Sequence, residues 1–185
     1  MAPAPRLRRI LRDARRAGRR VLLFGIGNEL LADDAVGFLI ARDLTSSPND
    51  PAPVDGGFLL PDAAVNRFQA SGLISIPVGT ALENAAGLVV TRAADVVFLV
   101  DAVRPPRRNA RPWAFYDPDH LDAFIHSTHS VPMRLLVRWW REERPGIEVH
   151  FLGLRIAGIA PFDGMSPAVE ASRREIVGIF RTILA

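Results

Sequence analysis

Residues 20–44 read RVLLFGIGNELLADDAVGFLIARDL, and this stretch decides the fold class. The apolar run at 20–27 ends in glycines, as expected of a strand that is buried on both faces. Within 33–44 the apolar residues recur at helical spacing, and Asp33 is placed to act as the N-cap. A buried strand that leads through a tight turn into an amphipathic helix predicts an α/β unit.

The rest of the chain continues this alternation of strands and helices. Further strands are predicted over 53–57, 95–103, 111–116 and 147–159, and further helices over 61–69, 79–88, 131–144 and 166–184. We therefore expect a single α/β domain over 20–185, a three-layer α/β/α sandwich around a mostly parallel, twisted sheet of roughly five strands. Such folds place their functional sites at the carboxyl ends of the strands.

Residues 1–19 form a basic leader in front of this domain. Of the 23 basic residues, all arginine, eight lie within the first 20 positions, whereas the remainder of the chain carries 15 arginines and 19 acids. A weak apolar stripe of Leu7, Ile10, Leu11 and Ala14 predicts a surface helix or a frayed terminus. Because no aromatic residue is interleaved with these arginines, we expect no nucleic-acid partner.

Composition excludes several other classes of protein. The sequence contains no cysteine, which excludes disulfides, thiolate metal ligands and a thiol nucleophile. No segment approaches the roughly 20 apolar residues of a membrane span. It also contains no H-E-x-x-H motif, so an ordinary zinc protease is not predicted. We expect a cytoplasmic protein.

The glycine turn at 25–37 raises the alternative of a dinucleotide-binding module with a Rossmann-like fold. Gly25 and Gly27 let the chain turn sharply, and Asn28 can hold the turn through bonds to the backbone. A Rossmann turn has a third glycine where this sequence has Leu30. Two carboxylates, at positions 33 and 34, would also repel a pyrophosphate at the helix N-terminus. This interpretation is therefore the second choice.

Carboxylates and imidazoles could together form a metal site. Asp34 lies just after the first strand, and Asp101 ends an apolar run in which an unpaired carboxylate is costly. His126 and His129 lie in a polar loop, and either could complete a set of two oxygens and one imidazole that leaves positions open on a divalent ion. His120 and His150 are less suitable, because one follows a turn signal and the other alternates within a strand.

Four segments resemble landmarks of the hydrogenase maturation endopeptidases, in the same order. GIGNELLADDAVG (25–37) matches every fixed position of the family's opening G-x-G-N-x-L-x-x-D-(D/E)-x-x-G. FLVDAV (98–103), STHS (127–130) and GIAPFDGMSPAVEAS (158–172) resemble the family's later landmarks. Proteins of this family remove a C-terminal peptide from the large subunit of [NiFe] hydrogenases once nickel has been inserted.

The resemblance implies a role for individual residues. Asp34 and Asp101 fall on the family's two metal-binding acids, which are also the catalytic candidates, and His129 falls on its histidine, with His126 as the rival. The nickel then arrives with the substrate, the precursor of a [NiFe] hydrogenase large subunit, although other divalent ions could occupy the same ligands. We expect a monomer when the protein is free. A nonproteolytic metal-binding assembly factor on the same fold is a further alternative.

The chain departs from the family pattern in two places. In the family, DGG is commonly followed at once by threonine and a helix, whereas here DGG (55–57) is followed by a segment at about 58–78 that we interpret as an insertion on the rim of the cleft. The basic leader is also additional. Neither departure involves a predicted ligand, so both concern specificity more than activity.

Overall fold

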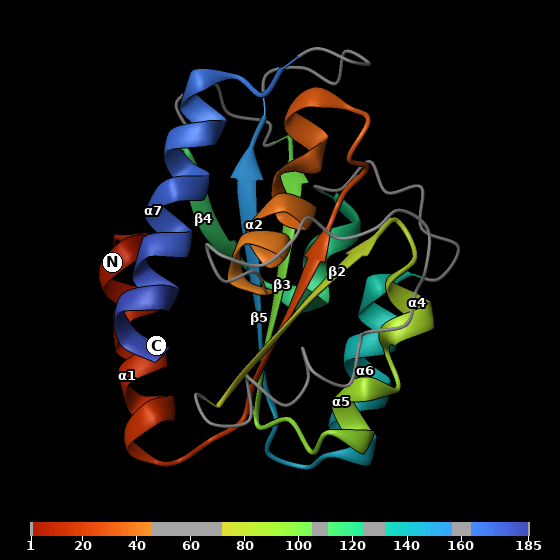
Figure 1. Cartoon of the computed structure of the whole chain (residues 1–185). Coiled ribbons are helices and arrows are strands. Elements are labelled where there is room, and N and C mark those ends of the chain that lie inside the picture. Colours follow the sequence, from red (N-terminus) through yellow and green to blue (C-terminus); the bar gives the residue numbers. More distant parts are fainter. Residues whose placement is uncertain (1, 46–71, 105–110, 124–131, 157–163, 185) are drawn as a thin grey trace.

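The protein is built around one mixed sheet of five strands (Figure 1). A computed structural model describes residues 2–45, 72–104, 111–123, 132–156 and 164–184. The strands are β1 (Val21–Ile26), β2 (Leu73–Gly79), β3 (Val96–Val103), β4 (Trp113–Tyr116) and β5 (Glu148–Arg155), in the order β2-β1-β3-β5-β4. All neighbouring pairs are parallel except β4 and β5, which are antiparallel. The predicted α/β fold with a mostly parallel sheet is confirmed.

Helices cover both faces of this sheet and complete the three layers (Figure 1). One core joins the sheet to α1, α2 and α7, and a second core joins its other face to α4, α5 and α6. The alternating side chains of β1 divide between these cores, with Leu23 in the first and Phe24 in the second. The helices are α1 (Pro3–Arg16), α2 (Val36–Thr45), α4 (Leu82–Ala85), α5 (Leu88–Thr91), α6 (Met133–Glu143) and α7 (Pro167–Leu184), with 3₁₀ turns η1 (Ala32–Ala35) and η2 (Pro118–Ala123).

The order of the strands creates a switch point between β1 and β3. From β1 the chain passes through α2 on one face to β2, and from β2 it returns through α4 and α5 on the other face to β3. After β3 the chain runs through β4 and η2 to α6 on that second face, so the connections that follow the adjacent strands β1 and β3 lie on opposite faces of the sheet. In open α/β sheets, ligands bind at the carboxyl ends of the strands at such a point.

The basic leader is an integral part of the fold. Its first 16 residues include α1, whose Leu7 and Leu11 are 0% exposed and whose Ala14 is also buried. This apolar stripe packs against α7, and the Arg15 guanidinium donates to the carbonyl of Ile183 over 2.5 Å. Of the two predictions, the surface helix is confirmed and the frayed terminus is wrong. No helix in the described ranges is both long and apolar enough to cross a bilayer.

The second strand of the described sheet was not predicted. The predicted strand at 53–57 and helix at 61–69 fall outside the described residues, whereas β2 begins at Leu73 and pairs with β1 from Val21 onward. Residues 73–78 of the segment that we interpret as an insertion belong to this strand, and the insertion itself stays a prediction. Pro77 obscured this strand in the sequence, but an edge strand tolerates a proline.

The remaining predicted elements are found with small shifts of their ends. The predicted helix at 79–88 is divided into the two short helices α4 and α5. Gly79 and Thr80 lead directly from β2 toward α4.

Candidate functional site

Close packing of backbone against backbone shapes the turn that follows β1. A Cβ atom on Gly25 would overlap the carbonyl of Gly37, and a Cβ atom on Gly27 would overlap the carbonyl of Asp34. Gly27 also has a φ of 136°, a value that side chains other than hydrogen rarely permit. Both predicted turn glycines are therefore required, because the chain that returns through η1 lies directly on them.

Gly37 is a third glycine whose role the sequence analysis missed. It lies in the first turn of α2, where a Cβ atom would overlap the carbonyl oxygens of both Ile26 and Val100. The helix thus begins directly over the carboxyl ends of β1 and β3. The signal was available, because position 37 is the last fixed glycine of the opening motif, but spacing alone did not reveal what it contacts.

Asn28 and Asp34 hold each other within this turn. The Asn28 side-chain oxygen accepts from the Leu30 amide over 3.0 Å, which confirms the predicted role of Asn28. The Asn28 amide donates to Oδ2 of Asp34 over 2.9 Å. The second oxygen of this carboxylate has no hydrogen-bond partner among the residues that the structure describes. One oxygen of Asp34 is therefore oriented by the backbone of the turn.

The same contact bears on the dinucleotide alternative. Phosphate-binding turns present backbone N–H groups to the ligand. Here the Asn28 N–H is already used by a carboxylate that lies at the start of the helical segment. The turn is thus organised around negative charge, which attracts a cation and not a pyrophosphate.

Asp101 lies in β3, two residues before the strand ends, and is 4% exposed. Its Oδ1 accepts from the amide of Ala102 over 2.7 Å. The alternation of the strand places it on the same face as Leu99 and Val103, which belong to the core beneath α6. Because η1 contacts β3, Asp34 and Asp101 lie at the same edge of the sheet, beside the switch point.

Two of the four histidines are outside the described residues, and the other two lie away from the edge of the sheet that carries Asp34 and Asp101. His126 and His129 are both outside, and no group of three possible metal ligands occurs elsewhere in the described chain. His120 is exposed, with Nδ1 2.9 Å from Oδ2 of Asp117. His150 is in β5, its ring 5.2 Å from that of Phe98, and burial lowers its pKa. The set of Asp34, Asp101 and a histidine therefore stays a prediction.

Asp33 does not occupy the N-cap position that was predicted for it. It lies inside η1, whose N-cap is Leu31. Its carboxylate is 3% exposed and accepts from both the amide (2.7 Å) and the hydroxyl (3.0 Å) of Ser166, directly before α7. The capping rule is local and could not reveal a partner 133 residues away. The opening and closing motifs of the chain thus meet at this contact.

Comparison with solved structures identifies proteins that share this architecture. No protein-family model matches the sequence, and no curated protein matches it either. The [NiFe] hydrogenase maturation protease HycI from Thermococcus kodakarensis superposes with a TM-score of 0.68 at 21% identity, covering 95% of this chain and 98% of HycI.

Two further structures agree with this match. A hydrogenase 3 maturation protease has a TM-score of 0.65 at 20% identity, covering 88% of this chain and 89% of its own. The hydrogenase-maturating endopeptidase HybD from Escherichia coli has a TM-score of 0.56 at 22% identity, covering 88% of this chain and 93% of HybD. The fold that the sequence motifs imply is thus confirmed over almost the whole length of the chain: it is the fold of the [NiFe] hydrogenase maturation proteases.

Proposed function

We propose that this protein is an endopeptidase of hydrogenase maturation. It recognises nickel in the precursor of a [NiFe] hydrogenase large subunit and removes the C-terminal peptide of that precursor. The observation that carries the proposal is the position of two carboxylates, Asp34 and Asp101, at the switch point of a fold shared with HycI and HybD. Asp34 follows β1 and Asp101 lies near the carboxyl end of the neighbouring β3, at the edge of the sheet where ligands bind in such folds.

The ligand set suits a metal that is delivered by another protein. Two carboxylates and the imidazole of His129 leave coordination positions open on a divalent ion. The precursor would supply the other ligands, so the nickel belongs to the substrate. Binding then depends on the metal being in place, which would prevent cleavage of a precursor that has not received it.

Cleavage needs a water molecule that is activated close to the scissile bond. The nickel can polarise the carbonyl or lower the pKa of a bound water. One of the two carboxylates can instead accept the proton of the attacking water. Asp34 is a candidate both for binding the metal and for accepting this proton, because the Asn28 amide holds one of its oxygens in a fixed position.

The direct test compares two forms of one precursor. Large subunit loaded with nickel and the same subunit without metal are incubated with the protein, and the released peptide is identified by mass spectrometry. We expect cleavage of the loaded form alone. Equal cleavage of both forms would contradict recognition through nickel, and cleavage of neither by the intact protein would contradict the proposed activity.

Variants of the predicted ligands test the site. Asp34→Asn, Asp101→Asn and His129→Ala should each abolish cleavage while circular dichroism shows an intact fold. His126→Ala is the matched control, because it removes a histidine only three positions away in the sequence and should leave cleavage unchanged. Normal processing by the His129→Ala protein, with loss in His126→Ala, would transfer the role to His126.

A further inference from the structure

The contact between Asp33 and Ser166 joins two distant parts of the chain at the candidate site. Asp33 precedes Asp34 directly, and both of its carboxylate oxygens accept from the same serine, over 2.7 Å and 3.0 Å. Hydrogen bonds that involve an ionised carboxylate are stronger than those between neutral groups. A pair of such bonds from one residue also fixes the direction of the carboxylate. Asp33 is thus attached to Ser166 in one orientation.

Ser166 is itself held by a rigid element. Its carbonyl accepts from the Glu170 amide over 2.9 Å, which makes it the residue from which α7 starts, and Pro167 follows at the first helical position. This helix runs over 18 residues, and Val169, Ile176 and Phe180 anchor it in the core. Ser166 therefore moves only if α7 moves with it.

The turn that carries Asp33 and Asp34 needs such an external support. Ala32, at the start of η1, has a φ of 34°, in the left-handed region that residues with a side chain seldom adopt. A strained backbone conformation persists only when the surrounding structure holds it in place. The hydrogen bonds from Ser166 reach the residue directly after Ala32 and can supply that restraint.

We infer that Asp33 is a positioning residue, which fixes η1 on the N-terminus of α7 and thereby aims the Asp34 carboxylate at the site. The inference rests on the proposed function for its effect on cleavage. The restraint itself is a property of the fold. Without it, η1 can relax at Ala32, and the bond between Asp34 and the Asn28 amide loses its fixed geometry.

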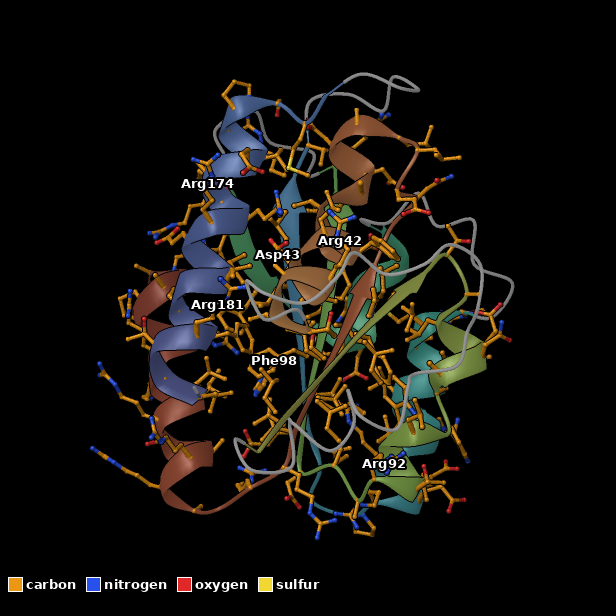
Figure 2. The ribbon with its side chains drawn as sticks, viewed as in Figure 1. Arg42, Asp43, Arg92, Phe98, Arg174 and Arg181 are labelled. Carbon is orange, nitrogen blue, oxygen red and sulfur yellow. The ribbon has the colours of Figure 1, made fainter. Side chains whose placement is uncertain are left out.

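A matched control links α2, the helix that follows η1, to the same helix α7. Arg173 of α7 binds the Asp43 carboxylate of α2 through two hydrogen bonds of 2.9 Å, and Arg181 donates to the Asp43 carbonyl over 2.6 Å. Figure 2 labels Asp43 on α2 together with Arg181 on α7. This link also joins the α2 region to α7, but it lies near the end of α2 that is farther from Asp34. Its loss should lower stability without disturbing the site.

The experiment compares Asp33→Ala and Ser166→Ala with Asp43→Ala in cleavage of a nickel-loaded precursor, below the melting temperature of every variant. Asparagine is unsuitable at position 33, because its oxygen can accept from the Ser166 N–H while its NH₂ group donates to the Ser166 hydroxyl. Asp33→Ala loses both bonds, and Ser166→Ala loses only the hydroxyl bond. We expect kcat to fall at least about tenfold in Asp33→Ala, since misplacing a group by about 1 Å costs on the order of 10²-fold. The KM of both aspartate variants and the kcat of Asp43→Ala should stay near the wild-type values.

Amide hydrogen exchange provides a readout that needs no activity. The amides of Asn28 and Asp34, both bonded within the turn, should exchange faster in Asp33→Ala than in Asp43→Ala. Unchanged exchange in Asp33→Ala, or an equal fall of kcat in both aspartate variants, would overturn the inference. If the wild-type protein cleaves no precursor, the proposed function fails while the exchange result still decides whether Asp33 restrains the turn.

Discussion

Replacing Gly37 with alanine tests whether close approach of α2 to the sheet creates the site. A Cβ atom at this position would lie 2.2 Å from the carbonyl oxygen of Ile26 and 2.2 Å from that of Val100. Ordinary van der Waals contact begins near 3.4 Å, so the start of the helix must move away by about 1 Å. Both oxygens belong to strand backbone, and neither can rotate aside as a side chain can.

The expected loss of stability follows from this overlap. Overpacking a well-packed core by one group costs about 1–3 kcal/mol, and the rigidity of both neighbours favours the upper end of that range. For a domain of this size, about 3 kcal/mol corresponds to a fall in melting temperature of roughly 6–12 °C. A displacement of about 1 Å next to Asp34 should also lower the rate of cleavage on the order of 10²-fold.

Gly178→Ala is the control for this substitution. Gly178 lies in the interior of α7 and is exposed, and a Cβ atom there would meet nothing within 4 Å. Alanine is favoured over glycine in a helix by about 1 kcal/mol, so this variant should be more stable than the wild type. Urea unfolding followed by circular dichroism measures both changes. A midpoint for Gly37→Ala equal to that of the wild type, or shifts of the same sign in both variants, would refute the reasoning.

Three further predictions concern the cores and their pH dependence. Leu7→Ala should lower the free energy of unfolding, measured in urea, by about 2–5 kcal/mol because Leu7 is fully buried. Arg9→Ala, on the exposed face of the same helix, should change it by less than about 0.5 kcal/mol. Equal effects of the two substitutions would contradict the packing of α1 on the core. Burial lowers the pKa of His150, so the folded state favours the neutral ring, and stability should fall as the pH drops below the unfolded value of about 6.5. His150→Gln should reduce this loss of stability between pH 7.5 and 5. An equal loss in the variant would show that other groups cause the pH dependence. Trp140→Phe removes a hydrogen bond of 2.9 Å from the buried indole to the carbonyl of Ala86 and should cost about 1–3 kcal/mol, measured in the same way; an unchanged midpoint would show that this bond contributes nothing.

The fold class could be predicted because its signals are local. A buried strand is a short continuous apolar run, and an amphipathic helix repeats every 3.6 residues, so the elements around β1 and β3 were found near their true positions. The strand β2 was missed, since Pro77 interrupts a short apolar run that is recognisable as a strand only beside β1. Pairing with a partner some 50 residues away decides whether such a run becomes a strand, and no local pattern contains that information.

The candidate site shows even more clearly which features depend on local sequence and which depend on tertiary contacts. The sequence by itself determined that Asp34 and Asp101 each follow or end a buried strand, and that glycines surround the first of them. Only the tertiary structure decided that β3 lies beside β1, that Gly37 allows α2 to lie directly against both strands, and that Asp33 binds Ser166. The physical reason is that periodicity and turn chemistry act between neighbours in the chain, whereas strand order and carboxylate partners depend on contacts between segments that meet only after folding.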